Sequence, residues 1–484
     1  MGGKIKGNIK KWEELDQRLV QIKPSKRQIE FQKLEFYAFV HFTVNTFTGK
    51  EWGDGTENPE IFSPDQFDAV QWVTAIKDAG MKGLILTCKH HDGFCLWPSK
   101  YTKHTIAASP YKDGKGDIVR EVAEACSVAG IKFGVYLSPW DRNSVLYGRG
   151  KEYDDFFINQ LTELLTNYGS VFDVWFDGAC GEGSNGKKQC YDWERYYEVI
   201  RKLQPEACIN VCGPDIRWCG NEAGDTRDAE WSVVPKRLKN TEMVASKSQQ
   251  EEDSDFSFRG RKISSSDENL GSREILENEK ELIWYPVEVN TSIRPGWFYH
   301  EDEDDKVRSL EELSQIYFHS VGGNGTFLLN IPPNKNGLFA KEDIVRLKEL
   351  GQFLRTAFKK NLMENAVLSV DSYKAGCNIE NVREPGYDSY FSTEEGVTSC
   401  VIDIQFNEEK IVNYLVLQEN IELSQRVEGF SVKAEVNGIM EDIYYGKVIG
   451  YKHIAQLKGI STKCLQINIL DARVCPTLSF VGIY

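Results

Sequence analysis

The chain has 484 residues, of which 41% are hydrophobic and 27% charged, a composition typical of a folded globular protein and unlike that of a disordered chain. Its 58 Lys and Arg residues against 73 Asp and Glu residues give a net charge of −15, which disfavours binding to nucleic acid or to an anionic membrane surface. No apolar run approaches the roughly 18 residues that a membrane span requires, so we expect no membrane-spanning segment.

The first residues are polar and basic and lack the apolar core of a signal peptide. A chain that begins at a mature N-terminus would look the same, so the compartment stays open and includes a periplasmic or secreted location. The 12 cysteines show no CxxC spacing, and several lie in apolar runs. We therefore expect buried free thiols instead of a disulfide framework or a zinc cluster.

Eight short apolar runs alternate with segments of helical periodicity between about residues 35 and 335. The runs predicted as strands cover residues 36–42, 83–88, 133–137, 172–176, 207–211, 228–233, 282–289 and 326–331. Capping residues and terminal glycines predict intervening helices over residues 65–79, 117–129 and 153–168. Eight strands, each followed by a helix or a long loop, are typical of a (β/α)8 (TIM-like) barrel, which is an α/β fold.

A polar segment over residues 246–281 interrupts this alternation, and we interpret it as a solvated insertion without chemistry of its own. Beyond residue 360 the helical periodicity ends and alternating β runs follow. Examples are residues 400–406, 411–418, 430–435 and 465–470. The sequence therefore predicts a catalytic barrel domain over residues 1–360 and an all-β sandwich domain over residues 361–484.

Functional side chains of such barrels come from the carboxyl ends of the strands, and the run 172–176 ends directly at Asp177. An Asp after a strand can cap the next helix or face the barrel mouth. Trp175 lies two residues earlier and so on the same face of the strand, which would place an indole and a carboxylate in one pocket. This pairing favours a functional role for Asp177.

The loop after residue 211 carries three carboxylates, Asp215, Glu222 and Asp225, together with Arg217 and Trp218. Glycosidases need two carboxyl groups, about 5 to 5.5 Å apart when one is a nucleophile and about 6.5 to 9.5 Å apart when water intervenes. Neighbouring strand ends could supply such a pair. The alternative is a solvated acidic loop.

Three of the seven histidines, His41, His90 and His91, stand at two neighbouring predicted strand ends. A metal site is one interpretation. However, consecutive residues of a strand point to opposite faces, so His90 and His91 would not share an ion without a turn between them. We therefore favour hydrogen bonding to sugar hydroxyls and predict no metal and no cofactor.

Tryptophans near the strand ends, which could stack on a sugar, are Trp52, Trp140, Trp175, Trp218 and Trp297.

Five segments near these strand ends carry a family resemblance. They are His41-Phe42, Glu51-Trp52, His90-His91-Asp92-Gly93-Phe94, Trp175-Phe176-Asp177-Gly178 and Gly220-Asn221-Glu222-Ala223-Gly224. In combination they resemble the α-L-fucosidases of glycoside hydrolase family 29. The segments 417–421 and 425–430 resemble the discoidin-like carbohydrate-binding β-sandwich that follows the barrel in these enzymes, so the resemblance covers the whole chain.

The resemblance implies an exo-acting, retaining double-displacement mechanism without a metal ion. Asp177 would be the nucleophile, and Glu222 the general acid and base, as in the subfamily selective for α1,3- and α1,4-linked fucose. The residues that would hold the fucosyl group are His41, Glu51, Trp52, His90, His91, Tyr136 and Trp175, with Arg217 and Trp297 as looser candidates. The partner implied is a fucosylated oligosaccharide, and the oligomeric state is left open.

Three alternatives remain beside this hypothesis. The same scaffold could act on α-L-galactosides, which differ from fucosides by one hydroxyl group. The barrel could be inactive and the protein a carbohydrate-binding protein. The histidines could belong to a metal-dependent barrel hydrolase.

Overall fold

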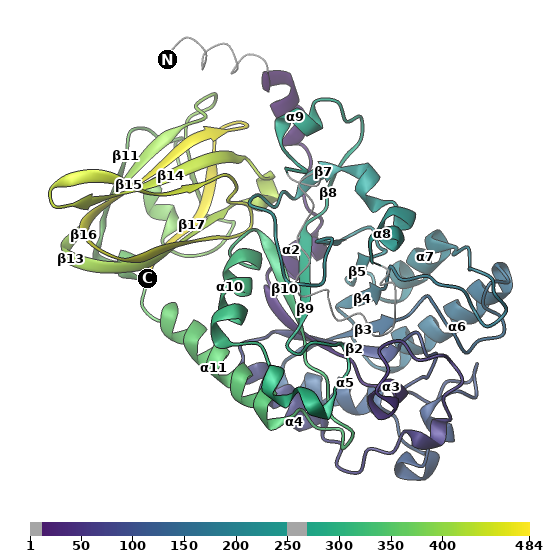
Figure 1. Cartoon of the computed structure of the whole chain (residues 1–484). Helices are drawn as coiled ribbons and strands as arrows, with labels where there is room; N and C mark the ends of the chain where they lie inside the picture. The colour runs from purple at the N-terminus through teal and green to yellow at the C-terminus, as the bar shows by residue number, and fades with distance from the viewer. Residues whose placement is uncertain (1–11, 249–268) are drawn as a thin grey trace.

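The computed structural model describes residues 12–248 and 269–484, which form a barrel and a β-sandwich (Figure 1). The barrel strands are β1 (Phe36–Val40), β2 (Gly83–Lys89), β3 (Lys132–Leu137), β4 (Asp173–Phe176), β5 (Cys208–Val211), β6 (Arg217–Trp218), β9 (Val287–Ser292) and β10 (Gly325–Asn330). They pair in parallel in the order β5-β4-β3-β2-β1-β10-β9-β6. A bridge from Asn210 to Ile216 links β5 to the start of β6, so the ring is nearly closed and the predicted (β/α)8 fold is confirmed.

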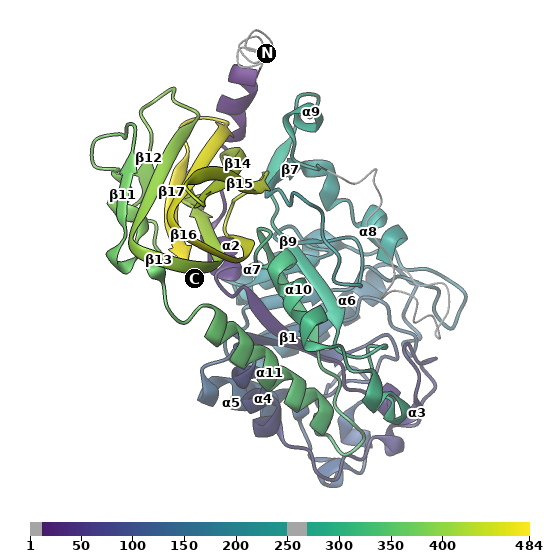
Figure 2. The same cartoon turned by 60° about the vertical axis from the view of Figure 1, so that its left-hand side comes forward.

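Helices surround the strands, and Figure 2 brings two of them, α10 and α11, forward on the outside of the barrel. Residues 12–19 are helical, and the helices that follow are α2 (Lys26–Gln32), α3 (Val44–Thr48), α4 (Ala69–Asp78), α5 (Ile118–Ala129), α6 (Lys151–Asn167), α7 (Trp193–Leu203), α8 (Thr241–Ser248), α9 (Arg273–Leu276), α10 (Leu310–Ser320) and α11 (Lys341–Ala357). The predicted limits of α5 hold, because Asp117 caps its first turn and Gly130, with φ +73°, ends it. The helix predicted from residue 65 begins later, because Asp68 is the residue that caps α4.

The sixth barrel strand differs from the prediction. Residues 228–233 do not form it; Val233–Pro235 is strand β7, which pairs antiparallel with β8 (Leu282–Trp284) outside the barrel. The two-residue strand β6 is instead the strand that follows β5 in the barrel and pairs with β9. The predicted strand 282–289 is therefore two strands, β8 and β9, that belong to different sheets. A two-residue strand has too few side chains to give an apolar run, which explains why the sequence pattern did not reveal β6.

The insertion predicted over residues 246–281 falls partly outside the described residues. Its described end is not a free solvated loop, because Arg273 of α9 is buried and pairs with Asp16 at 2.8 Å and with Asp471 of the sandwich at 2.5 Å. This helix therefore ties the barrel insertion to the second domain.

The sandwich is built from antiparallel strands in the order β12-β17-β13-β16-β14-β15, with β11 paired to β13. Its strands are β11 (Val367–Val370), β12 (Phe391–Ser392), β13 (Cys400–Glu419), β14 (Val427–Val436), β15 (Ile439–Gly446), β16 (His453–Ala472) and β17 (Thr477–Ile483). The runs predicted at 400–406 and 411–418 are parts of one long strand, β13, whose pairing with β16 shifts register between them. All 12 cysteines lie within the described residues and are free, as expected, but only seven are buried; Cys190 is exposed and the other four are partly buried.

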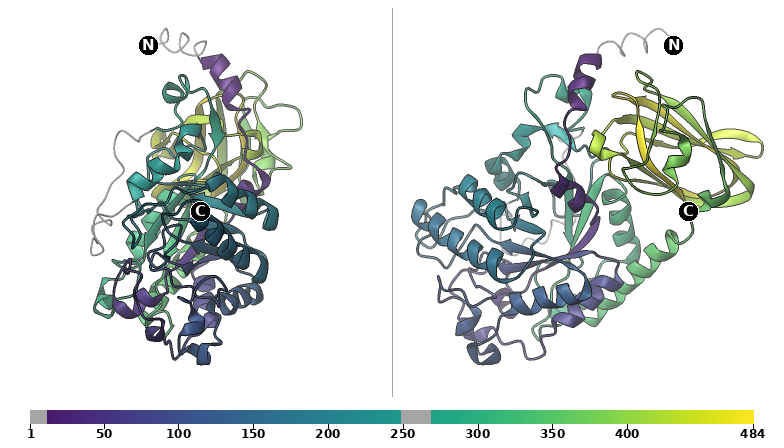
Figure 3. Two further views of the ribbon diagram at one scale, coloured as in Figure 1. Left: turned by 90° about the vertical axis from the view of Figure 1, so that its right-hand side faces the viewer. Right: turned by 180° about the vertical axis from the view of Figure 1, so that it is seen from behind.

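The sandwich lies to one side of the barrel (Figure 3) and contacts the amino ends of the barrel strands. Glu35, directly before β1, accepts hydrogen bonds from the Tyr451 hydroxyl (2.8 Å) and from Lys452. Asn324, directly before β10, accepts one from the Tyr451 backbone N–H at 2.7 Å. The sandwich is therefore docked at the end of the barrel opposite to the carboxyl ends of the strands. Among the described helices, none is long and apolar enough to cross a membrane.

Candidate active site

A pocket opens at the carboxyl ends of the barrel strands, where functional side chains of this fold are expected. Its lining residues are Phe39, His41, Glu51, Trp52, His90, His91, Trp175, Asp177, Ala179, Glu222, Asn290 and Trp297. Every one of them belongs to the barrel. The structure thus brings together both predicted carboxylates and most of the predicted sugar-binding residues.

Asp177 follows β4 directly and is held by two hydrogen bonds. The Tyr136 hydroxyl donates to Oδ2 at 3.0 Å, and the Ala179 backbone N–H donates to Oδ1 at 2.8 Å. Burial raises the pKa of Asp177 above that of an exposed aspartate, and these two donors oppose the rise. Asp177 does not cap the next helix, because Asp192 caps α7. Its carboxylate is therefore available to the pocket.

The turn after β2 aims two histidines into the same pocket. Asp92 fixes this turn by accepting hydrogen bonds from the Phe94 N–H at 2.7 Å and from the Thr43 hydroxyl at 2.8 Å. Gly93 has φ +79°, and a Cβ there would meet an Asp141 carboxylate oxygen at 2.5 Å, so only glycine fits. The motif His-His-Asp-Gly-Phe is thus a compact turn.

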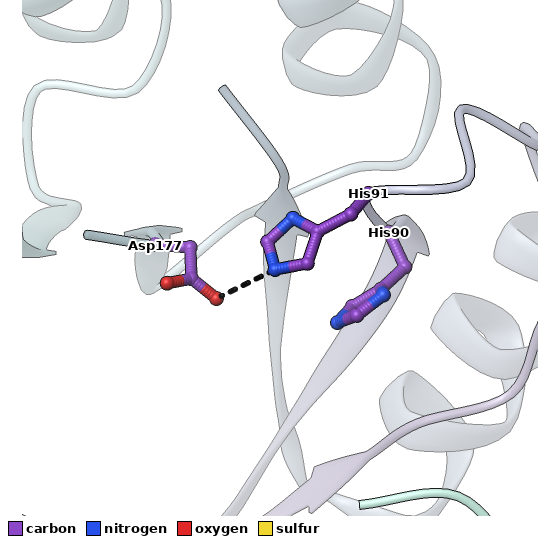
Figure 4. Close-up of side chains that lie close together, drawn as sticks. All are labelled: His90, His91 and Asp177. Carbon is purple, nitrogen blue, oxygen red and sulfur yellow. Dashed lines mark ion pairs between the residues drawn. The ribbon is translucent and has the colours of Figure 1, made fainter. Parts of the chain in front are cut away.

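The expectation that His90 and His91 face opposite sides is wrong, because β2 ends at Lys89 and both residues lie in the turn. Their ring centroids are 4.2 Å apart, and Nε2 of His91 lies 3.6 Å from Oδ2 of Asp177 (Figure 4). One ligand atom from each of these three residues lies within 4.8 Å of the others, a spacing at which they can hold a metal ion. Chemistry that uses two carboxyl groups does not draw on such an ion.

The proton position on His91 follows from its neighbours. The Ser138 hydroxyl donates its one proton to the Trp140 carbonyl at 2.7 Å, so it accepts from Nδ1–H of His91, also at 2.7 Å. Burial lowers the pKa of His91 to about 3, so the ring is neutral near pH 7 and Nε2 carries a lone pair. This nitrogen can accept a hydrogen bond from a ligand in the pocket.

His41 is arranged in the same way. The amide nitrogen of Asn330 donates to the Trp297 carbonyl at 2.8 Å, which leaves its oxygen to accept from Nδ1–H of His41 at 2.8 Å. Burial lowers the pKa of His41 to about 3. His41 and His91 therefore both present neutral, accepting Nε2 atoms, which suits a hydroxyl-bearing ligand.

Glu222 lies in the loop after β6, not after β5 as the sequence indicated. Asn221 shapes this loop by accepting hydrogen bonds from the backbone N–H groups of Ala223 at 2.9 Å and Asp225 at 3.2 Å. The indole N–H of Trp297 donates to Oε2 of Glu222 at 3.3 Å. Glu222 is partly buried and lines the same pocket as Asp177.

Glu51 fixes the loop that carries Trp297. Its carboxylate accepts hydrogen bonds from the backbone N–H groups of Trp297 at 2.7 Å and Phe298 at 3.3 Å. It also contacts Nε2 of His300 at 3.0 Å, and this hydrogen bond raises the pKa of His300. Sequence reasoning did not single out His300, since it has no neighbouring motif.

Arg217 lies outside the pocket. Its guanidinium pairs with buried Glu230 at 2.6 Å and donates to the Tyr285 carbonyl. Side chains alternate along β6, so Trp218 faces the other way and donates its indole N–H to Asn290 at 2.9 Å. Asn290 also lines the pocket, but it lies inside β9, so the expectation that functional side chains follow the strand ends does not point to it.

Comparisons with known proteins show the family to which the chain is similar. The family model described as Alpha-L-fucosidase matches residues 24–358. Alpha-L-fucosidase 1 of Arabidopsis thaliana is 37% identical over 469 residues, which cover 95% of this chain and 87% of the relative. The solved structure of a Ruminococcus gnavus GH29 fucosidase in complex with fucose is 31% identical with a TM-score of 0.82, and covers 96% of this chain and 95% of that chain.

Proposed function

The chain belongs to the α-L-fucosidase family of glycoside hydrolases, and from this premise we propose that it releases terminal α1,3- or α1,4-linked L-fucose by retaining double displacement. The observation that carries the proposal is that Asp177 and Glu222 line one pocket. Two carboxyl groups flanking a glycosidic bond are the machinery that this reaction needs.

In the first step Asp177 attacks C1 of the fucosyl group while Glu222 donates its proton to the departing glycosidic oxygen. The C1–oxygen bond breaks, an ester forms between C1 and Asp177, and the alcohol leaves. In the second step Glu222 takes a proton from water, whose oxygen attacks C1 and releases fucose and the Asp177 carboxylate. Two inversions at C1 give net retention.

Glu222 must begin the cycle protonated and end the first step ionised. The negative charge of Asp177 in the same pocket favours the protonated form of Glu222. Ester formation removes that charge, so the acidity of Glu222 increases at the point where it must act as a base.

The neutral histidines supply the hydroxyl recognition in this proposal. Nε2 of His41 and Nε2 of His91 accept from sugar hydroxyls, and His90, Glu51 and Trp52 complete the polar wall of the pocket. Trp175 and Trp297 offer flat apolar faces to the C–H surface and the methyl group of fucose. A pocket lined on all these sides suits a terminal residue, which is why we propose exo action.

The test is turnover of fucosylated substrates by the wild type and by Glu222→Gln. We expect release of fucose from α1,3- and α1,4-linked trisaccharides, with slower release from an α1,2-linked one. Glu222→Gln should lower kcat/KM, which reports the first step, about 10²- to 10⁴-fold on these oligosaccharides and much less on an aryl fucoside whose leaving group needs no proton. Equal losses on both substrates would remove Glu222 from the acid role.

The same assays decide the alternatives. A nitrophenyl α-L-galactoside hydrolysed faster than the matching fucoside would assign the galactosidase activity. The absence of turnover on every fucoside would leave the carbohydrate-binding alternative.

We also propose a carbohydrate-binding role for the sandwich, based on its resemblance to discoidin-like domains. Because it contacts the amino ends of the barrel strands, any such site would be separate from the pocket. A binding stoichiometry of two fucosylated ligands per Asp177→Asn chain would support this role, and a stoichiometry of one would argue against it.

A further inference from the structure

A carboxylate that the proposed mechanism does not use lies inside the barrel beneath the pocket. Glu288 of β9 is fully buried and accepts three hydrogen bonds from three other strands. The donors are the Tyr37 hydroxyl at 2.6 Å, the Trp175 indole N–H at 2.7 Å and the Asn210 amide at 2.9 Å. Among the described residues no cation is within ion-pairing distance of Glu288, so burial raises its pKa and its role is to accept hydrogen bonds.

One of these donors belongs to the pocket wall. Trp175 lines the pocket with its ring, and its N–H points down to Oε1 of Glu288. The ring also stacks on Tyr136, with centroids 5.4 Å apart and planes 28° apart. Tyr136 in turn donates its hydroxyl to Asp177. Glu288 is therefore linked through one indole to the sugar-binding surface and to the proposed nucleophile.

We propose that Glu288 is a positioning residue for substrate binding: it fixes the orientation of the Trp175 indole through the N–H group. This inference rests on the proposed function, since it assigns to Trp175 the sugar-stacking role. A tryptophan without an acceptor for its buried N–H would tilt toward one, because an unsatisfied buried donor is unfavourable. The tilt would change the surface that meets the sugar.

The surroundings of Glu288 predict which substitution this role tolerates. A glutamine can keep its oxygen toward Trp175 and turn its amide group toward Tyr37 and Asn210. The Asn210 Oδ1 atom has no hydrogen-bond partner in the described part of the chain, so a flipped Asn210 can accept from that amide. The Tyr37 hydroxyl can also accept from the glutamine amide group. It can then donate its own proton to the Thr326 hydroxyl, which lies 3.0 Å away. Glutamine therefore keeps an acceptor for the Trp175 N–H, whereas leucine leaves the Trp175 N–H and the Asn210 amide without their acceptor.

The experiment compares Glu288→Gln, Glu288→Leu and the matched control Asp173→Asn on an aryl fucoside. Asp173 is another fully buried carboxyl of the barrel interior, but neither of its oxygens has a hydrogen-bond partner among the described residues. We expect Glu288→Gln and Asp173→Asn to keep KM within about 3-fold of wild type. Glu288→Leu should raise KM at least about 10-fold with a smaller change in kcat.

A spectroscopic readout covers the case in which Glu288→Leu folds poorly. In ¹⁵N-indole spectra the Trp175 N–H signal, assigned by its loss in Trp175→Phe, should move strongly in Glu288→Leu and little in Asp173→Asn. An unchanged KM in a folded Glu288→Leu protein, or an unmoved Trp175 signal, would overturn the proposal. If the proposed function itself is wrong, the wild type will not turn over the fucoside, so this outcome can be distinguished from failure of the role proposed for Glu288.

Discussion

Replacing Asp177 with asparagine should abolish turnover while leaving the fold at least as stable as in the wild type. The asparagine oxygen can still accept from the Ala179 N–H, and its new amide group can donate to Nε2 of His91, which lies 3.6 Å from the replaced oxygen. The Tyr136 hydroxyl, which donates to Oδ2 of Asp177, can accept from that amide group instead. Both polar atoms of the asparagine side chain therefore have hydrogen-bond partners.

The rate effect follows from the loss of the nucleophile. We expect kcat to fall at least about 10³-fold, which corresponds to about 4 kcal/mol of lost transition-state stabilisation. The fucose affinity should fall modestly, since Nε2 of His41 stays free to accept while the new amide group competes with the sugar for Nε2 of His91.

The stability effect follows from the pKa. Burial raises the pKa of Asp177 in the folded state, so holding it ionised costs stability at every pH above that pKa. Asparagine removes this cost at pH 7, and we expect a gain of about 1 kcal/mol, or about 2 °C in Tm. The difference should vanish near pH 3, below the ordinary pKa of aspartate at about 3.9, where the carboxyl is protonated in both states. Melting curves of both proteins at pH 7 and pH 3 measure it, and a lower Tm for the variant at pH 7 would refute the reasoning.

Three further predictions concern the surroundings of the pocket. Tyr136→Phe removes a hydrogen bond that lowers the Asp177 pKa, so the acidic limb of the kcat/KM profile should move to higher pH; an unmoved limb would contradict this contact. Arg217→Met should lower the free energy of unfolding by about 3 kcal/mol, because Glu230 loses a buried partner. The kcat of the folded variant should stay unchanged, and a large loss of kcat would show that Arg217 contributes to the active site. A chelator should leave the fucosidase rate unchanged. A loss of activity that added zinc reverses would instead indicate that the cluster of two histidines and one aspartate binds a catalytic metal ion.

Much of the barrel, and the clustering of the candidate residues at its mouth, could be predicted because both depend on local patterns. The apolar runs that became β1 to β5 and β10 are long enough to show their periodicity, and Asp177 follows such a run directly. The strand β6 could not be found this way, since Arg217 and Trp218 alone fix its place through pairing with β9.

Other features depend on contacts between distant parts of the chain. Glu288 and Asn290 lie within a strand and acquire their partners only when the barrel closes, so sequence spacing gave no sign of either. The orientation of His90 and His91 was misjudged because the strand ends one residue before them, and a turn frees consecutive residues from strand alternation.

The most direct test of the account is to trap the covalent intermediate. A 2-deoxy-2-fluoro-fucosyl fluoride slows hydrolysis of a glycosyl ester, so mass spectrometry of the digested protein locates the labelled residue. We expect one fucosyl group per chain, attached to Asp177, and a first-formed fucose product with the α configuration by NMR. A label on another residue, or a first-formed β product without any label, would contradict it.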